Sequence, residues 1–226
     1  MQVRQKVSLV FLLDVDNTLI DNDRAKRDMQ GQLLQLLGKE GSDRFWALYE
    51  EVRKELDVVD FPETLRRFAT NWKDKVVAEK AQGLLDSWPY KGYLYPGAIA
   101  TLEYLSDFGE VAILSDGDTE FQPRKIASAG ITEAVGGPAD VLIYTHKETC
   151  FEDVMERLPS DHYVLIDDKE KILAGAKEVM KDKLTTIWVK QGHYASDPAF
   201  YRKPDPDVAV DSIGEISSLG KQSFLE

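Results

Sequence analysis

The feature that most constrains this chain is an apolar run that ends in two carboxylates. Residues 9–13 have the pattern of a buried strand, and Asp14 and Asp16 follow it directly. Two close carboxylates repel each other unless a cation lies between them or one of them holds a proton. Because strand side chains alternate between two faces, both carboxylates reach one pocket only if the chain leaves the strand after Asp14. The pattern predicts a ligand site at the carboxyl end of a strand, where open parallel sheets bind ligands.

Further apolar runs predict a parallel α/β sheet. Each run is short, is bounded by polar or turn-forming residues, and is separated from the next by a stretch with helical periodicity. In one of these stretches, Phe151, Val154, Met155 and Leu158 recur at the spacing of a single helix face. The expected strands are residues 9–13, 110–114, 140–144, 163–166 and 184–189, and the expected helices are about 97–107, 119–129, 147–158 and 168–180.

The stretch of residues 22–90 differs from the rest of the chain, because it has several helical runs and no strand-like run. A connection this long needs structure of its own. We therefore expect a helical subdomain over 22–90, inserted into a core domain formed by residues 1–21 and 91–226. Such an insertion would overhang the strand ends as a lid does. Its aromatic residues are expected mainly in its own core, with one or two facing the cleft: Phe45, Trp46, Tyr49, Phe61, Phe68 and Trp72.

Composition narrows the classes of partner. Of the 226 residues, 43% are hydrophobic and 30% are charged, which suits a globular domain with a sizeable core. The net charge of -12 disfavours nucleic acid and anionic membranes as partners, because both require a cationic face. We expect a small molecule as the partner, and the oligomeric state stays open.

Cysteine usage and the apolar runs indicate a cellular compartment. The single cysteine, Cys150, cannot form an internal disulfide, which suits the reducing cytoplasm. The apolar run near the start is interrupted by Asp14 and Asp16 and lacks a small-residue cleavage site, so it predicts neither a signal peptide nor a membrane span. The expected location is the cytoplasm.

Polar groups follow four of the expected strands, so they would converge along one edge of a parallel sheet. After the carboxylate pair come Ser115, Lys147 and the pair Asp167 and Asp168. These groups suit phosphoryl transfer, in which one carboxylate attacks phosphorus and a second carboxyl group transfers protons. Carboxylates and phosphate oxygens bind Mg²⁺, while a hydroxyl and an ammonium group hold the remaining phosphoryl oxygens.

Nearly the whole chain resembles the haloacid dehalogenase (HAD) superfamily of phosphohydrolases. Residues 14–18 match the first motif of that superfamily, Asp-x-Asp-x-Thr. Ser115 and Lys147 match the second and third motifs, and Asp167 with Asp168 matches the acidic fourth motif. The resemblance is specific because four motifs occur in order, each at the end of an expected strand.

The resemblance implies both a fold and a reaction. The fold would be an α/β structure with a Rossmann-like parallel sheet core, and the 22–90 insertion would be the helical C1-type cap. The reaction would be Mg²⁺-dependent hydrolysis of a small phosphate ester through an aspartyl phosphate. Members that cleave carbon–halogen bonds have no acid at the position of Asp16, whereas phosphatases do, so the resemblance favours a phosphatase.

The resemblance also implies residue roles. Asp14 would be the nucleophile and a metal ligand. Asp16 would be the general acid and base, and its main-chain carbonyl would also reach the metal. Asp167 would complete the metal site, with Asp168 as the alternative ligand.

The remaining matched residues would bind the phosphoryl group. Ser115 would contact its oxygens, with Asp116 beside it, and Lys147 would pair with both Asp14 and the phosphoryl group. Asp116 stands where the superfamily commonly has Asn, so it adds a negative charge near the phosphate.

Two other positions depart from the superfamily pattern. Asn17 stands where many members have Gly, although Asn also tolerates turn conformations. Lys171 stands where relatives often have a second acid, so metal binding would depend on Asp167 and Asp168.

Several residues have alternative roles. Lys125 competes with Lys147 as the site lysine, but it lies within an expected helix, whereas Lys147 starts one directly after a strand. Asp168 could instead cap the following helix. His146 is expected to face solvent or packing, and His193 is expected in a loop near the same sheet edge.

Two other functions stay open at this level. A phosphomutase would keep the aspartyl phosphate but pass the phosphoryl group to another sugar hydroxyl. A HAD-like binding module would keep the fold without turnover, and Lys171 with Asp116 is its best support.

Overall fold

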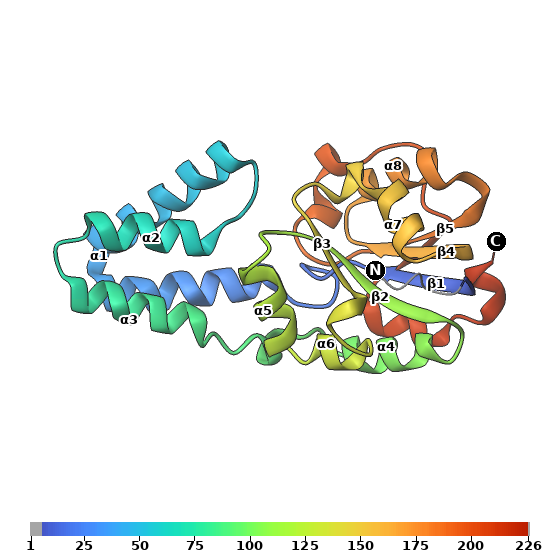
Figure 1. Ribbon diagram of the computed structural model, residues 1–226, viewed down its shortest axis with the longest axis horizontal. Helices are drawn as coiled ribbons and strands as arrows, with labels where there is room; N and C mark the ends of the chain where they lie inside the picture. The colour runs from blue at the N-terminus through green and yellow to red at the C-terminus, as the bar shows by residue number, and fades with distance from the viewer. Residues whose placement is uncertain (1–5, 226) are drawn as a thin grey trace.

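A computed structural model describes residues 6–225 of the protein (Figure 1). Its core is a six-stranded sheet in the order β3-β2-β1-β4-β5-β6. All neighbouring strands are parallel, so their carboxyl ends lie along one edge. The strands are β1 (Val7–Leu13), β2 (Glu110–Asp116), β3 (Val141–Tyr144), β4 (Ser160–Asp167), β5 (Leu184–Val189) and β6 (Val208–Val210).

The five expected strands are confirmed, and a sixth is added. Residues 208–210 form β6 beside β5, with Val208 aligned with Ile187. Three residues between Asp207 and Asp211 are too short a run to indicate a strand on their own. After β6, Ile213 and Ile216 are buried and pack the end of the chain onto the sheet layer.

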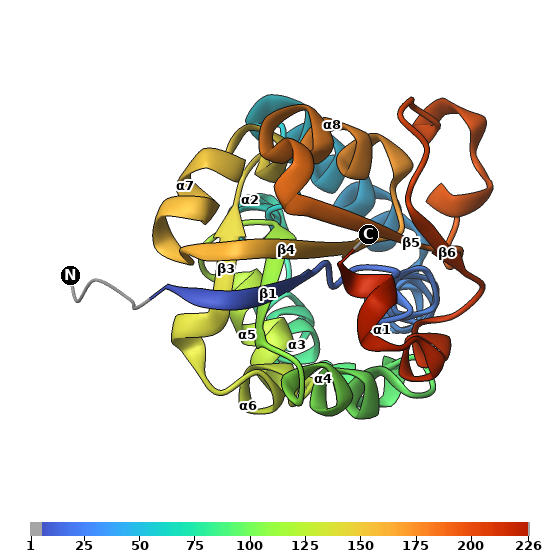
Figure 2. The ribbon, with the colours of Figure 1, turned by 90° about the vertical axis from the view of Figure 1, so that its right-hand side faces the viewer.

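Helices cover both faces of the sheet (Figure 2). Alternate residues of β1 separate the two layers: Phe11 packs with the layer that contains α4–α6 and the C-terminal turns, whereas Leu12 packs with α7 and α8. The α-helices are α1 (Asn22–Leu56), α2 (Phe61–Asn71), α3 (Lys75–Asp86), α4 (Ala98–Ser106), α5 (Phe121–Ser128), α6 (Ile131–Ala134), α7 (Phe151–Arg157) and α8 (Glu170–Met180). The 3-10 turns are η1 (Tyr90–Tyr93), η2 (Pro138–Asp140), η3 (Lys147–Thr149), η4 (Lys181–Lys183), η5 (Tyr194–Ser196), η6 (Pro198–Phe200), η7 (Ile213–Ser218) and η8 (Lys221–Phe224).

One expected helix is divided. The sequence predicted a single helix over about 147–158, but η3 ends at Thr149 and α7 begins at Phe151, with Cys150 between them. The first turn is tightened because Lys147 is held at two points. Its main-chain N–H donates to Asp116, and its side-chain ammonium donates to Asp14 at the end of β1. The predicted apolar face of α7 is confirmed, since Phe151, Val154 and Leu158 are buried.

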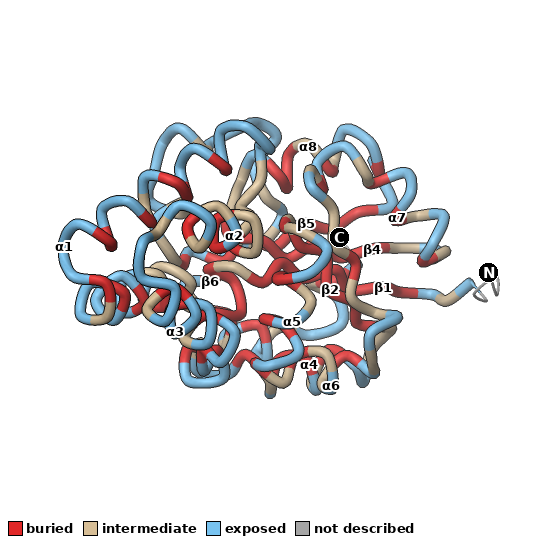
Figure 3. The backbone as a smooth tube through the Cα atoms, turned by 60° about the vertical axis from the view of Figure 1, so that its left-hand side comes forward, coloured by how far each residue is buried: buried red, intermediate tan, exposed pale blue. Residues whose placement is uncertain are grey.

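Helices α1, α2 and α3 form a separate helical unit beyond the carboxyl ends of the strands (Figure 1). They occupy the segment expected to be the cap, while the division of the chain into domains stays a prediction. Helix α1 reverses direction at Gly38, whose φ of 66° and ψ of 177° interrupt the helix. Glycine tolerates this positive φ without a Cβ clash. The two halves of α1 therefore run back along each other, and buried residues line their inner side (Figure 3).

The two connections between this helical unit and the sheet are joined by main-chain hydrogen bonds. Ile20 and Leu94 form an antiparallel bridge. On either side of it, the N–H of Asp21 donates to the carbonyl of Tyr93 at 2.8 Å, and the N–H of Tyr95 donates to that of Leu19 at 2.9 Å. The entry and exit segments thus form a short antiparallel ladder. Within residues 6–225, none of the helices is both long enough and apolar enough to span a bilayer.

Candidate active site

The carboxyl ends of β1 and β4 and the turn after β3 meet at a buried ion-pair cluster. Lys147 is fully buried, and its Nζ lies 2.5 Å from Oδ1 of Asp14 and 2.7 Å from Oδ2 of Asp167. Burial alone would lower the pKa of Lys147, but the charges of Asp14, Asp167 and Asp116 outweigh it and raise the pKa well above its usual value. Lys147 is therefore held as a cation between two carboxylates.

Asp168 completes a group of three buried carboxylates. One oxygen from each of Asp14, Asp167 and Asp168 lies within 4.8 Å of the others. Both carboxylate oxygens of Asp168 are buried and accept no hydrogen bond from residues 6–225. Burial, with the charges of Asp167 and Asp14, raises the pKa of Asp168 to about 9. Unpartnered, crowded carboxylate oxygens of this kind fit a divalent cation, which prefers oxygen ligands.

The alternative role of Asp168 as a helix cap is wrong. The residue at the N-cap of α8 is Lys169, and no side chain caps that helix. It is Asp167 that bonds to this turn, since its Oδ1 accepts from the N–H of Lys169 at 2.8 Å. Asp168 follows the last residue of β4, and its carboxylate is left to face Asp14 and Asp167.

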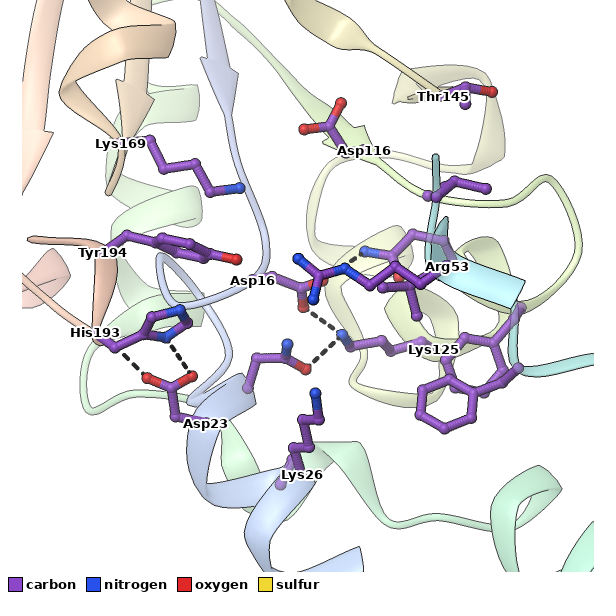
Figure 4. Close-up of a pocket in the computed structure, with 18 of the residues that line it drawn as sticks. Asp16, Asp23, Lys26, Arg53, Asp116, Lys125, Thr145, Lys169, His193 and Tyr194 are labelled. Atoms are coloured by element: carbon purple, nitrogen blue, oxygen red, sulfur yellow. Dashed lines mark hydrogen bonds and ion pairs between the residues drawn. The ribbon is translucent and has the colours of Figure 1, made fainter. Parts of the chain in front are cut away.

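Asp16 belongs to a second network. Its carboxylate forms an ion pair with Lys125 of α5, and its Oδ2 accepts a hydrogen bond from Nε2 of Gln122 at 3.2 Å (Figure 4). Lys125 also donates to Oδ1 of Asn22, the first residue of α1, at 2.9 Å. Gln122 in turn donates to Oγ of Ser115 at 3.0 Å. The network therefore connects Asp16 with the predicted phosphate-binding hydroxyl and with the start of the helical unit.

The structure thus gives the two candidate lysines different partners. Lys147 pairs with Asp14, as predicted, and Lys125 pairs with Asp16, which the sequence analysis missed. Gln122 and Lys125 are three residues apart on α5, so they share a helix face, and that spacing after the Ser115 strand was the available signal. It could not show how far the lysine reaches.

Asp116 has a defined structural partner. Its Oδ1 accepts from the main-chain N–H of Lys147 at 2.8 Å, which fixes the turn that carries the site lysine. Burial raises the pKa of Asp116 above its usual value, against the opposing charge of Lys147. Asp116 also lines the cavity, next to Gly117.

The loop of the first motif, residues 14–18, orients the Asp14 side chain by a hydrogen bond and turns at Asn17. Thr18 Oγ1 donates to Oδ2 of Asp14 at 3.2 Å. Asn17 has a φ of 65°, so the turn conformation that Asn tolerates is confirmed. Gly192 packs so closely against Asn17 that a Cβ at this glycine would lie 2.4 Å from Asn17 Cβ. The loop after β5 therefore supports the motif loop from behind.

A cavity of about 520 Å³ opens between the sheet edge and the helical unit. Asp16 and Asp116 line it, whereas Asp14 lies deeper and is only 2% exposed. Two aromatic residues of the insertion, Tyr49 and Phe61, line the cavity, and Phe45 and Phe68 are buried in the insertion, as expected. The other lining residues include Asn22, Lys26, Arg53, Tyr90, Phe121, Gln122, Lys125, Lys169 and Tyr194.

Three further polar residues of the sequence analysis line the cavity. His146 Nε2 lies 3.5 Å from Oδ2 of Asp57, and both residues line the cavity. His193 Nδ1 lies 2.7 Å from Oδ1 of Asp23, and the main-chain N–H of His193 donates to Oδ2 of the same carboxylate. Lys171 stacks over the Phe200 ring at 5.1 Å and does not replace the missing acid in the carboxylate group.

Comparison with known proteins agrees with this geometry. The haloacid dehalogenase-like hydrolase family matches residues 9–179. A protein of Burkholderia xenovorans LB400, described as a haloacid dehalogenase-like hydrolase, is 39% identical, with a TM-score of 0.87 over 97% of this chain and 100% of its own. No curated protein matches the chain.

More distant structures share the fold. A HAD phosphatase of Thermococcus onnurineus is 20% identical, with a TM-score of 0.63 over 95% of this chain and 97% of its own. The L-2-haloacid dehalogenase of Xanthobacter autotrophicus is 18% identical, with a TM-score of 0.58 over 94% of this chain and 98% of its own. The match of the family over most of the length, with the 39% identical relative, shows that this chain belongs to the haloacid dehalogenase-like hydrolases.

Proposed function

We propose that the protein is a magnesium-dependent phosphatase that hydrolyses a small organic phosphomonoester through an aspartyl phosphate. The observation that carries the proposal is that Asp14 and Asp16 lie next to each other at the strand end but in different environments. Asp14 lies in the buried group of three carboxylates, and Asp16 lines the cavity beside it. A hydrolase that only displaced a halide would have no need of the second acid, because a halide leaves without a proton.

The residues that would hold the metal are Asp14, Asp167 and Asp168, together with the main-chain carbonyl of Asp16. When bound, Mg²⁺ would screen the charge of Asp14 from that of the substrate phosphate. Asp168 suits direct ligation best, because both of its oxygens lack partners within residues 6–225. Asp167 is already engaged by Lys147 and by the main chain of Lys169.

In the first step, a carboxylate oxygen of Asp14 attacks phosphorus and the ester P–O bond breaks. The leaving oxygen takes a proton from the Asp16 carboxyl group. Lys147 and the Ser115 hydroxyl stabilise the charge that develops on the phosphoryl oxygens. This step frees the alcohol and leaves the phosphoryl group on Asp14.

In the second step, water attacks the aspartyl phosphate and gives its proton to Asp16. The bond between phosphorus and the Asp14 oxygen breaks, which regenerates Asp14 and releases inorganic phosphate.

The cavity volume of about 520 Å³ suits a small metabolite as the substrate. The acidic surface disfavours nucleic acid and membrane partners, and Cys150 without a disulfide partner suits the cytoplasm.

The test is release of inorganic phosphate from a panel of phosphorylated metabolites, with and without Mg²⁺. Activity should require the metal, and Asp14→Asn should reduce it to background. Accumulation of an isomerised sugar phosphate would favour the phosphomutase. Magnesium binding without turnover of any ester would favour a binding module, and chloride release from L-2-chloropropionate would identify a dehalogenase.

A further inference from the structure

Two cationic side chains of α1 face the cavity from opposite halves of the helix. The reversal at Gly38 brings the turn that carries Lys26 alongside the turn that carries Arg53. Lys26 and Arg53 line the cavity (Figure 4). Tyr49, one turn before Arg53, also lines it. None of these three residues belongs to the site formed by the strand ends.

The Lys26 ammonium is partly buried and forms no ion pair within residues 6–225. No carboxylate of residues 6–225 lies within 4 Å of its Nζ, and its closest polar contact is the Tyr49 hydroxyl at 3.5 Å. The ammonium lies 4.5 Å from the centroid of the Tyr49 ring and 5.7 Å from that of Trp46. The faces of these rings attract a cation but do not neutralise it. Burial lowers the pKa of Lys26; the nearby charge of Glu50 opposes this shift, and the charge of Arg53 adds to it.

Arg53 is only weakly paired. Its Nη1 lies 3.6 Å from Glu50, in an exposed contact, and its side chain is 51% exposed. An exposed ion pair at this distance contributes little. Lys26 and Arg53 are thus two like charges near each other, with Glu50 as the acid shared between them.

Most acids of the cavity already have partners, so they are not available to these cations. The exception is Glu148, which is exposed on the turn after β3. The paired acids are Asp16 with Lys125, Asp23 with His193, Asp57 with His146, and Asp116 with the Lys147 main chain. Lys26 forms no ion pair within residues 6–225 and Arg53 forms only an exposed one, so both cations on the α1 side of the cavity are free to pair with an incoming anion.

We propose that Lys26 and Arg53 form a second anion site, so the substrate is a phosphomonoester whose leaving group carries a carboxylate or a second phosphate. The inference rests on the phosphatase function proposed above and adds the class of leaving group. The transferred phosphoryl group has its own ligands in Lys147 and Ser115 deep at the strand ends. Lys26 and Arg53 lie on the side of Asp16, which would protonate the leaving oxygen, so they meet the rest of the substrate.

The test compares pairs of esters that differ only in the second anionic group. For a carboxylate, 2-phosphoglycolate is compared with 2-hydroxyethyl phosphate. For a second phosphate, fructose 1,6-bisphosphate is compared with fructose 6-phosphate. The wild-type protein should prefer one acidic member by about 10-fold or more in kcat/KM, as expected for charge-assisted hydrogen bonds. The preferred pair identifies which anion the site takes.

Lys26→Met and Arg53→Met should each remove most of this preference, chiefly by raising KM for the acidic ester, while the neutral ester changes less than about 2-fold. The matched control is Lys54→Met, an exposed lysine next to Arg53 that does not line the cavity. It should keep the preference. Equal losses on both members of a pair, or no preference in the wild type, would overturn the second anion site while leaving the phosphatase function intact.

Binding provides a readout that does not depend on turnover. Calorimetric titration of 2-phosphoglycolate and of 2-hydroxyethyl phosphate into Asp14→Asn with Mg²⁺ should show tighter binding of the acid, and Lys26→Met added to this variant should abolish the difference. The same titration is made with the fructose phosphates. If no ester is hydrolysed by the wild type, the phosphatase proposal fails, and these titrations still decide whether the site exists. Equal affinities within both pairs would refute it.

Discussion

Lys125 and Asp16 form an ion pair at the cavity wall although they are 109 residues apart in the sequence. The lysine is only 4% exposed, and its second contact is Asn22 at the start of α1. The residue proposed to transfer protons is therefore oriented by α5 and by the helical unit together. This relationship makes Lys125 a positioning residue for Asp16.

Lys125→Met should slow hydrolysis of alkyl phosphates more than that of p-nitrophenyl phosphate. An alkoxide needs a proton as it leaves, whereas p-nitrophenolate does not, so a misplaced Asp16 harms only the first class severely. We expect a loss of about 10-fold or more in kcat for the alkyl ester, within the range that general acids contribute. Steady-state kinetics on both esters measure it, with Arg124→Met on the exposed side of α5 as the control. Equal losses on the two esters would mean that Lys125 does not act through Asp16.

Lys147→Met should destabilise the metal-free protein by about 3–5 kcal/mol, because it leaves the buried carboxylates of Asp14 and Asp167 without their counter-charge. Saturating Mg²⁺ should restore part of this loss. Urea denaturation with and without the metal measures both effects. Lys39→Met, which removes an exposed pair with Asp43, should cost less than about 1 kcal/mol. A Lys147 variant as stable as this control would contradict the importance of the buried pair.

Asp168→Asn and Asp167→Asn should change metal-free stability in opposite directions. Asp168 has a buried carboxylate without hydrogen-bond partners, so its neutral amide should stabilise the metal-free protein, by about 1 kcal/mol or more. Asp167 pairs with Lys147, so Asp167→Asn should be destabilising. Thermal denaturation distinguishes the two variants.

The same Asp168 variant should bind Mg²⁺ poorly. The wild type should gain thermal stability as the metal concentration rises, since a ligand of the folded state stabilises it by mass action. Asp168→Asn should lose most of that gain. A variant that responds to Mg²⁺ as strongly as the wild type would exclude Asp168 as a ligand.

Protonation of Asp207 should lower the free energy of unfolding at acidic pH. Burial would raise the pKa of Asp207, but hydrogen bonds from Lys177 and from Thr186 outweigh it, so the pKa is lowered. A lowered pKa means that the contribution is fully present above the unfolded value of about 3.9 and disappears as the pH falls through the folded value. Asp207→Asn should cost about 1–3 kcal/mol at pH 7.

The check is urea denaturation of wild type and Asp207→Asn across this range. The two free energies of unfolding should differ at neutral pH and converge as the pH falls below the unfolded value and through the lowered pKa of Asp207. A difference that stays constant from neutral to acid pH would mean that the carboxylate charge does not contribute. Asp211→Asn, at an exposed contact with Lys190, should show little difference at any pH.

The sequence predicts the sheet and the strand-end residues well, because both depend on local patterns. A short apolar run followed by a polar residue identifies a buried parallel strand and its ligand-binding end at the same time. Asp14, Lys147, Asp167 and Asp168 were found in this way, and the structure brings them together. Strand β6 escaped prediction, because its three residues take their pairing from β5.

The cavity wall was not predictable, because it depends on where helices lie relative to the sheet. Lys125 is one basic residue within a helix until α5 places it against Asp16. Lys26 and Arg53 become neighbours only through the reversal at Gly38. The break at Cys150 likewise follows from the tertiary contacts of Lys147 rather than from local helix propensity.

The antiparallel ladder that bridges Ile20 and Leu94 limits how the helical unit can move. Two independent tethers would allow it to twist and slide over the strand ends. Because the two connecting segments are hydrogen-bonded to each other, they should bend together. We therefore expect a single hinge axis at these residues, perpendicular to the two segments. Asn22 lies two residues beyond the bridge and accepts a hydrogen bond from Lys125, so we expect opening about this axis to stretch the Lys125–Asn22 contact and with it the orientation of Lys125 toward Asp16. Closure of the helical unit over the strand ends would then also bring Asp16 into position as the proton donor.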